Sequence, residues 1–400
     1  MRLVHFSDVH LGIRQYQRTN SNGLNQREAD VALAFTRAVD KAIALVPDLV
    51  VIAGDIFHTV RPTNPALLHA FRQCQRLTTE LPNALVVMVA GNHDLPRSTE
   101  TVCILTLFAQ LGIQVVHRGP ERLSFPEREL SILAVPDVHG VAPPSLDTDA
   151  SARWNVLVLH GEVEGVIPLH AAPVDRATSG YTPADLAAAP WDYVALGHYH
   201  VYQRISQQAN AWYSGSLEYT SPNVWGELRE EKQQKLPGKG IIEHDLATGK
   251  HKFHPIAAAR PLIDLPVVNA RGLSAESVDV AIRNTIERSR VPIDDAIVRL
   301  VIDDIPRHVA RELDHAALRE YRRRTLHFHL DCRRPEPIRL SAVSGAPGRR
   351  PSLAETLRDR LHARPLESNV DREALVRLGL KYLRDAEEVV APAAVGEDEP

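Results

Sequence analysis

Five short polar motifs between residues 8 and 200 combine histidine with aspartate, asparagine and glycine. They are Asp8-Val9-His10, Gly54-Asp55-Ile56-Phe57-His58, Gly91-Asn92-His93-Asp94, His160-Gly161 and Gly197-His198-Tyr199-His200. Carboxylate oxygens, amide oxygens and imidazole nitrogens, with no thiolate among them, suit Mn²⁺, Fe²⁺ or Zn²⁺. The candidate ligands are more than one ion needs, and a carboxylate can bridge two ions. The residue types therefore favour a centre with two divalent metal ions.

Each motif follows a short apolar segment that the sequence predicts to be a β-strand. These segments are 3–6, 49–53, 85–90, 156–159 and 193–196. Loops beyond the carboxyl ends of strands in an open α/β sheet gather at one edge, so residues distant in sequence can meet there. A single Asp-x-His or His-x-His is more often a turn or a surface pair. Five such motifs, each at a strand end, favour one shared site over unrelated turns.

The alternation of predicted strands with longer helical patterns indicates an α/β fold. Helices are predicted over residues 27–45, from Asn64 as N-cap with Pro65 at the first helical position, and over 99–111. Because the last stretch is apolar on nearly every face, we expect it deep in the core or covered by another subunit. Segments 240–244 and 251–255 are predicted to form a hairpin that closes the first domain.

The chain is predicted to contain two α/β domains followed by a helical segment. The boundaries are 1–258 for the first domain, 259–332 for the second, 333–351 for a linker, 352–390 for the helical segment and 391–400 for a disordered tail. The second domain has predicted strands 262–268, 297–302 and 326–330, with helices at 274–287 and within 314–324. In the helical segment, Ser352 with Glu355 forms a capping box, and Asn369 is the expected N-cap of the second helix.

Composition and charge exclude several classes of protein. The chain is 44% hydrophobic but has no uninterrupted apolar run near the ~20 residues of a membrane span and no signal-peptide pattern, so we expect no membrane association and a cytoplasmic location. A formal net charge of −4 gives no general attraction to nucleic acid, so a polyanion must be held locally. No glycine-rich loop with a following Lys-Ser/Thr is present, so ATP binding by this chain itself is not expected.

Two basic segments are candidates for holding DNA phosphates. One is the loop 14–27, which carries Arg14, Tyr16 and Arg18, and the other is the run of Arg319 with residues 322–324. Such contacts position DNA without reading its sequence. A solvated charged face is the alternative interpretation of the run.

The order of the motifs resembles that of the calcineurin-like metallophosphoesterase superfamily. Within it, Gly54-Asp55-Ile56-Phe57-His58 and Tyr213-Ser214-Gly215-Ser216 are similar to the SbcD-type DNA double-strand-break repair nucleases. The resemblance covers the first ~260 residues by motif and the remainder by layout. It implies a β-sandwich flanked by helices, a small α/β capping domain over a DNA-binding cleft, and C-terminal helices that bind the coiled coil of an SMC-like ATPase of the SbcC type.

The resemblance also implies a role for each motif residue. Asp8, His10 and His200 resemble the ligands of the first metal, Asp55 the bridging carboxylate, and Asn92, His160 and His198 the ligands of the second metal. His93 resembles the acid beside the leaving oxygen, and His58 resembles an accessory histidine that positions the phosphate. Asp94 is expected either to orient His93 or a ligand, or to cap the next turn. The expected metal is Mn²⁺.

The chemistry fits hydrolysis of DNA phosphodiesters. Two cations lower the pKa of a shared water, neutralise charge on the phosphoryl oxygens and hold the attack in line. An imidazole with a pKa near neutrality suits protonation of the departing alkoxide. The sequence thus predicts a nuclease subunit that acts on DNA ends, with 3′-5′ exonuclease activity on double strands and endonuclease activity on single strands. A homodimer is expected through the apolar stretches 65–77 and 99–111.

Two other functions stay open at this stage. A phosphoprotein phosphatase or cyclic-nucleotide phosphodiesterase of the same superfamily is disfavoured because His58 stands where phosphatases continue the Gly-Asp motif as Asp-Arg-Gly. A catalytically idle scaffold that binds DNA ends is disfavoured because the ligand set is intact. Both histidines outside the coordination shell, His58 and His93, are also present, and a scaffold has no need for them.

Overall fold

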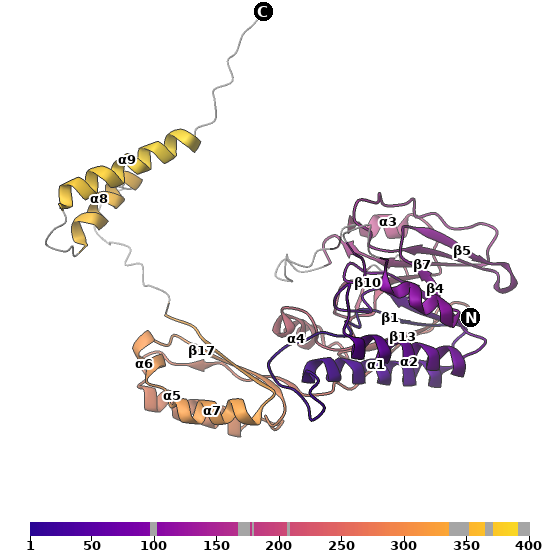
Figure 1. Ribbon diagram of the computed structural model, residues 1–400, viewed down its shortest axis with the longest axis horizontal. Helices are drawn as coiled ribbons and strands as arrows, with labels where there is room; N and C mark the ends of the chain where they lie inside the picture. Colours follow the sequence, from indigo (N-terminus) through magenta and orange to yellow (C-terminus); the bar gives the residue numbers. More distant parts are fainter. Residues whose placement is uncertain are drawn as a thin grey trace, which may run out of the picture. The chain divides into compact units, whose positions relative to one another are not determined.

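The structure, a computed structural model, describes residues 1–96, 102–166, 177, 180–205, 209–335, 352–364 and 371–390 of the 400-residue chain. The chain divides into two compact units, Met1–Pro335 and Glu336–Pro400 (Figure 1). Each unit is described by itself. In the part of the chain that the structure describes, no helix is long and apolar enough to cross a membrane.

Two six-stranded sheets form the main body of the first unit. The first sheet has the order β14-β13-β1-β2-β3-β4, with bounds β1 Arg2–Phe6, β2 Leu49–Ala53, β3 Leu85–Val89, β4 Gln114–Val116, β13 Gly240–Asp245 and β14 His251–Pro255. The second has the order β11-β12-β10-β7-β6-β5, with bounds β5 Glu121–Phe125, β6 Leu130–Val135, β7 Trp154–His160, β10 Tyr193–Gly197, β11 Gln203–Arg204 and β12 Ala211–Tyr213. The central strands of both sheets are parallel. The expected hairpin is confirmed as the antiparallel pair β13 and β14.

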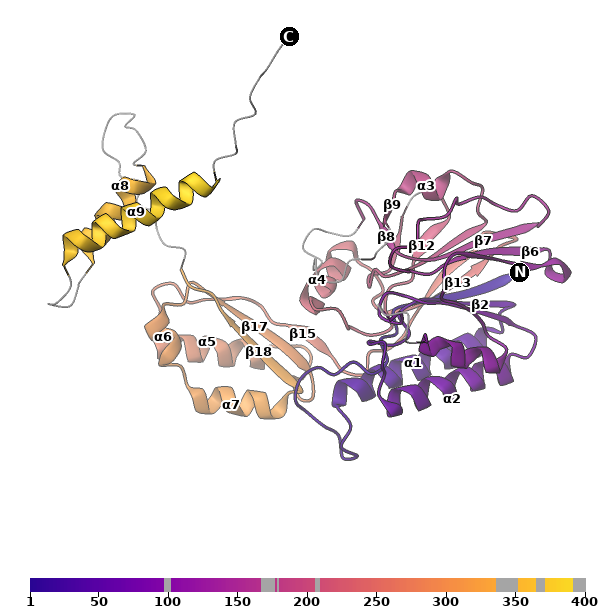
Figure 2. The ribbon, with the colours of Figure 1, turned by 45° about the horizontal axis from the view of Figure 1, so that its top comes forward.

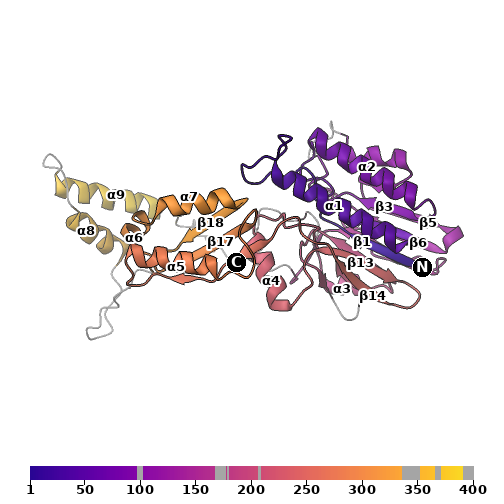
Figure 3. The same cartoon turned by 90° about the horizontal axis from the view of Figure 1, so that it is seen from below.

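The two sheets pack face to face and form a sandwich (Figure 2). Alternate residues of each strand point between the sheets, among them Val51 of β2 and Val158 of β7. The intervening residues of the first sheet, such as Val50 and Ile52, pack against helices α1 (Gln26–Leu45) and α2 (Asn64–Glu80). Figure 3 shows these two helices side by side on that sheet. The predicted β-sandwich flanked by helices is therefore confirmed.

Local sequence signals set the helix boundaries. Asn25 caps α1 by accepting hydrogen bonds from the backbone N–H groups of the first turn. The N-cap of α2 is Thr63, whose hydroxyl accepts from the N–H of Ala66, so the prediction of Asn64 as the cap was wrong by one residue. Pro65 is still in the first turn, where its missing N–H costs no hydrogen bond.

The predicted apolar helix over residues 99–111 was wrong in type and extent. Residues 99–101 of this range lie outside the described residues, and a 3₁₀ helix, η1, covers Ile104–Leu111. Its three-residue period buries Leu105 and Phe108. The side chain of Leu107 and that of Val102, just before the helix, stay exposed. Only one face of this apolar segment therefore enters the core of the chain.

A smaller sheet with its own apolar core follows residue 260. Its central strand β17 (Ile297–Asp303) pairs in parallel with β15 (Leu262–Asp264), β16 (Val268–Asn269) and β18 (His327–Cys332). Helices α5 (Ala275–Glu287) and α7 (His315–Arg324) contribute to the core on one face, and α6 (Arg307–Arg311) lies between them in sequence. The prediction of one strand over 262–268 was wrong, because Pro266 has no N–H to donate to the ladder and separates β15 from β16.

Several of the candidate DNA-binding arginines have partners within the chain. The guanidinium of Arg18 donates to the backbone oxygens of Arg322 and Arg323 at the end of α7, and the ring of Tyr16 stacks on His327 with 4.0 Å between centroids. Arg324 pairs with Asp294 at 2.8 Å. A DNA phosphate would compete with these contacts.

The second unit contains two helices, α8 (Leu353–Ala363) and α9 (Arg372–Val390). The predicted capping box of Ser352 and Glu355 is confirmed. Asn369 lies outside the described residues, and the first N–H groups of α9 donate to Asp371 instead. The two helices contact each other. Val376 of α9 is buried, whereas the side chains of Leu353, Leu378 and Tyr382 are exposed.

Candidate metal centre

The five motifs meet at the carboxyl ends of the parallel strands of both sheets. Backbone hydrogen bonds join the first two motifs, from the N–H of Asp8 to the oxygen of Gly54 and from the N–H of His10 to the oxygen of Asp55, both 3.0 Å long. Asp8, His10 and Asp55 all have left-handed backbone, with φ of 51–52°, and His198 has φ of 105°. Such strained non-glycine residues cluster at functional sites. The convergence that the sequence predicts is thus present in the structure.

Asp8, His10 and His200 place one donor atom each within 4.8 Å of one another. The Nε2 atoms of His10 and His200 are only 3.1 Å apart. The Oδ2 atom of Asp55 lies 3.7 Å from Nε2 of His10 and 3.5 Å from Nε2 of His160. Asp55 is therefore between the two groups of histidines, as a bridging carboxylate requires.

The buried His160 is held in one orientation by the second strand. Its Nδ1 donates to the backbone oxygen of Ala53 at 2.8 Å, because a carbonyl can only accept. This leaves the lone pair of Nε2 for a ligand, and Nε2 is 3.1 Å from Oδ1 of Asn92. Asp8, Asp55 and His160 also place one donor atom each within 4.8 Å of one another.

His198 is next to both groups. Its backbone N–H donates to Oδ1 of Asp8 at 3.0 Å. Its ring lies edge-on to that of His160, with 5.5 Å between centroids. The structure thus brings all seven predicted metal ligands to one site, and their assignment to individual ions remains a prediction.

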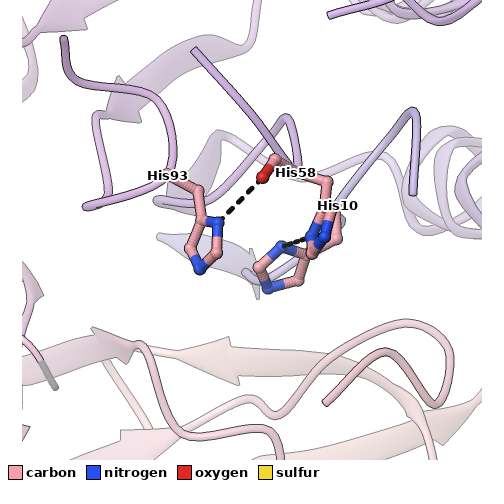
Figure 4. Close-up of side chains that lie close together, drawn as sticks. All are labelled: His10, His58 and His93. Atoms are coloured by element: carbon pink, nitrogen blue, oxygen red, sulfur yellow. Dashed lines mark hydrogen bonds between the residues drawn. The ribbon is translucent and has the colours of Figure 1, made fainter. Parts of the chain in front are cut away.

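His58 and His93 lie beside His10 and complete a third group of donor atoms (Figure 4). The ring of His93 donates from Nδ1 to the backbone oxygen of His58 at 2.8 Å, which directs its Nε2 away from that loop. The rings of His58 and His93 stack with 5.3 Å between centroids. Both predicted catalytic histidines are therefore at the centre, and neither is buried.

Opposite charges inside the centre shift the pKa values of Asp55 and His160. Burial by itself raises the pKa of Asp55, but His160 and His10 outweigh burial and hold that pKa well below its usual range. Burial likewise lowers the pKa of His160, but the carboxylate of Asp55 outweighs it and raises the pKa to about 10. A divalent cation at Nε2 of His160 would displace the second proton of that imidazole, so metal binding should release a proton.

Glycine is required where backbone and ligands approach closely. A Cβ atom on Gly91 would lie 2.1 Å from Oδ1 of Asp55, and one on Gly197 would lie 1.8 Å from the oxygen of Ala53. Both distances are too short for atoms that are not bonded to each other. The glycines of the motifs thus allow the ligands to reach the same point.

Asp94 contacts the backbone beside the predicted ligand Asp55. Its carboxylate accepts hydrogen bonds from the backbone N–H groups of Ile56, Phe57 and Gly91, at 2.9–3.2 Å. It therefore holds the loop that follows the predicted ligand Asp55, and these hydrogen bonds reach neither His93 nor the next turn.

Sequence reasoning missed Ser7 and Ser214. Ser7 donates to Asp8, and its hydroxyl is 2.8 Å from that of Ser214. Ser7 adjoins the first motif and Ser214 is in Tyr213-Ser214-Gly215-Ser216, so proximity to a motif was the available signal for both.

The donor set fits divalent metal ions. The close Nε2 atoms of His10 and His200 would both present lone pairs to one ion, and the nearby carboxylates supply the negative charge that a cation needs. A metal-binding histidine usually donates from its second ring nitrogen to a nearby acceptor. His160 makes such a hydrogen bond from Nδ1 to the backbone oxygen of Ala53.

Comparison with known proteins identifies the family. The model of the calcineurin-like phosphoesterase family matches residues 1–202, half of the chain, and this range contains all five motifs. The chain therefore belongs to the calcineurin-like phosphoesterase family.

Curated relatives share the name DNA double-strand break repair protein Mre11. The chain is 27% identical over 263 residues to that of Methanocaldococcus jannaschii, covering 62% of this chain and 63% of the relative. It is 25% identical over 309 residues to that of Saccharolobus solfataricus, covering 74% and 71%. The match to that of Sulfolobus acidocaldarius has 29% identity over 178 residues and covers 43% and 44%. The chain thus spans less than two thirds of the length of two of these three relatives.

Proposed function

We propose that this chain is the nuclease subunit of a DNA double-strand-break repair complex and uses two divalent metal ions. The observation that carries the proposal is the position of Asp55 Oδ2, 3.7 Å from Nε2 of His10 and 3.5 Å from Nε2 of His160. One carboxylate between two imidazole groups is the arrangement expected of a dinuclear site. The family match and the shared name of the relatives support DNA as the substrate.

In this proposal each group of residues has its own task. Asp8, His10 and His200 hold the first ion, Asn92, His160 and His198 hold the second, and Asp55 binds both. When bound, the two ions supply an activated water and neutralise charge on the phosphate. Mn²⁺ is the proposed metal, as the family resemblance implies, and the oxygen and imidazole donors are compatible with it.

The two remaining histidines act on the phosphodiester itself. His93 is proposed to protonate the departing sugar oxygen from Nε2, because its Nδ1 already donates to the oxygen of His58. His58 is proposed to hold a phosphoryl oxygen. Both are accessible beside the ligand His10, as a residue that touches substrate must be.

The proposed activity is 3′-5′ exonuclease action on double-stranded DNA and endonuclease action on single strands. The test is release of mononucleotides from linear duplex DNA with Mn²⁺, compared with release of phosphate from phosphopeptides. Covalently closed duplex circles, which have no ends, are the control substrate and should stay intact. Phosphatase activity alone would replace the proposal with the phosphoprotein phosphatase. Absence of both activities, with DNA ends still bound, would favour the scaffold.

We propose that the chain forms a homodimer through the apolar surface around α2 and η1. Leu68 is 54% exposed, Val102 73% and Leu107 36%, although all three are apolar. Light scattering in moderate salt is expected to give twice the mass of the 44.4 kDa chain. Leu68→Asp should shift the protein toward the monomer, since it places a charge in the proposed interface. A monomeric wild-type protein at micromolar concentration would contradict the dimer.

We also propose that α8 and α9 bind an SMC-like ATPase. Truncation after Pro347 should leave Mn²⁺-dependent nuclease activity within about threefold of the full chain, because all proposed ligands precede residue 201. The truncated chain should no longer co-purify with the ATPase. Burial of an exposed leucine contributes about 1.5–3 kcal/mol, so loss of several such contacts removes most of the affinity.

A point variant separates docking from folding of the helices. Leu378→Ser with Tyr382→Ser changes two exposed side chains of α9 and leaves its buried Val376 intact. These changes should weaken ATPase binding without lowering helix content by circular dichroism. Full binding by the truncated chain would place the interface on the nuclease domain instead.

The cytoplasmic location remains a prediction from the sequence.

A further inference from the structure

The metal-ligand candidate His200 has a buried glutamate behind it. Helix α4 (Val224–Gln234) carries Glu227, which is 8% exposed. Its Oε1 atom lies 3.6 Å from Nδ1 of His200, on the side of the ring opposite the Nε2 atom that faces His10. Oε1 is buried and makes no hydrogen bond to the residues that the structure describes. This carboxylate oxygen therefore lies beside Nδ1 of His200, the ring nitrogen that does not face His10.

The buried Lys239 holds both Glu227 and the backbone of His200. Its Nζ atom forms an ion pair with Oε2 of Glu227, lies 3.1 Å from Oε1 of Glu231, and donates to the backbone oxygen of His200 at 2.7 Å. Lys239 is 4% exposed. The ring and the backbone of His200 are therefore contacted by the same charged group of three residues.

The charges of this group are kept in the interior. Glu227 and Lys239 are both buried and face each other as a carboxylate and an ammonium group. A buried ion pair adds little net stability, since removal of its charges from water costs about as much as the attraction returns. Stability alone is thus a weak reason for two glutamates and a lysine at this place.

A histidine that binds metal through Nε2 carries its proton on Nδ1, and the acceptor of that proton fixes the tautomer and the ring. For His160 this acceptor is the oxygen of Ala53, and Nδ1 of His93 has the oxygen of His58. Two oxygens lie beside Nδ1 of His200, the hydroxyl oxygen of Thr220 at 3.4 Å and Oε1 of Glu227 at 3.6 Å. Of the two, the charged carboxylate is the stronger acceptor, and it is also a stronger acceptor than a carbonyl. A carboxylate also raises the basicity of the imidazole as a ligand.

We propose that Glu227 is a positioning residue of the metal centre, which holds His200 with Nε2 directed at the metal and is itself held by Lys239. This inference rests on the proposed dinuclear site. It assigns to α4, whose sequence has no metal-binding motif, a part in the affinity for the ion that His200 binds. Glu231 has no such part, because its carboxylate contacts Lys239 and Tyr219.

The test compares Glu227→Gln with Glu231→Gln in the full chain. Each variant removes one carboxylate charge from Lys239, but only the first removes the charge beside His200. Mn²⁺ is titrated into metal-free protein, and the free ion is followed by electron paramagnetic resonance. Loss of an outer carboxylate at a histidine ligand typically weakens metal binding about 10–100-fold, so Glu227→Gln should lose that much at one site. Glu231→Gln should stay within about threefold of the wild type.

The melting temperature of the metal-free protein separates positioning from folding. It should be similar for the two variants, because each leaves one glutamate on Lys239. If Glu227→Gln does not fold, Glu227→Asp, which keeps the charge but shortens the reach toward His200, is measured in its place. Wild-type affinity at both sites in the Glu227 variant would overturn this inference and leave the proposed function standing. Equal weakening in both glutamate variants would also overturn it. No Mn²⁺ binding by the wild type would overturn the proposed metal centre as well.

Discussion

Asp55→Ala is expected to abolish DNA hydrolysis and to remove one of the two metal ions at the same time. The carboxylate of Asp55 is the proposed bridge, and its Oδ1 also accepts the backbone N–H of His93 at 3.0 Å. Alanine leaves neither a ligand nor this acceptor, so the loop of His93 also loses a contact. Metal content after dialysis and release of mononucleotides from linear duplex DNA are the two measurements.

Asp55→Asn is the matched variant for this prediction. Its amide oxygen can still accept from the N–H of His93, so the loop is preserved while the bridging charge is lost. Activity should be lost in both variants, and the fold should be kept in the asparagine variant. Two tightly held ions together with nuclease activity in Asp55→Ala would refute the bridging role.

His93→Gln is expected to keep both metal ions and DNA binding but to slow hydrolysis. Loss of a general acid typically costs about 10²–10⁴-fold in rate, and glutamine cannot donate a proton to a departing oxygen. The ring of His93 lies 4.9 Å from that of His10 between centroids, outside the group of Asp8, His10 and His200. Single-turnover rates with saturating Mn²⁺ measure the chemical step.

His362→Gln provides the control for this substitution. His362 is an exposed histidine of α8, in the second unit of the chain, and no proposed ligand or catalytic residue lies there. The control should hydrolyse DNA at the wild-type rate. An unchanged rate in His93→Gln would remove His93 from the mechanism, and loss of metal would make it a ligand instead.

The apolar runs and the motifs that follow them were sufficient to predict an α/β fold and a shared site, whereas the β-sandwich was implied by the family resemblance. Runs such as 49–53 are apolar at every position because both faces of the central strands are buried, one against the other sheet and one against helices. The donors stand directly after these runs, and parallel strands present their carboxyl ends at one edge. Strand order was not needed to predict that the donors meet.

Local interruptions were harder to predict. The exposed sides of η1 result from its three-residue helical period, although its sequence resembles a buried α-helix. The break between β15 and β16 results from one proline in a sequence that resembles a single strand. Thr63 rather than Asn64 caps α2, since two adjacent polar residues can both serve as caps and sequence alone places a helix end only to within one or two residues.

Only the tertiary structure decided which side chains support the ligands. Asp94 is in a motif, yet its contacts with Ile56 and Phe57 depend on how two loops lie side by side. Glu227 is in an acidic, polar helix whose sequence is typical of a solvated surface. The 3.1 Å distance between His10 and His200 joins residues 190 positions apart. Periodicity and capping are properties of neighbouring residues, whereas such distances are set by sheet register and by the packing of whole elements.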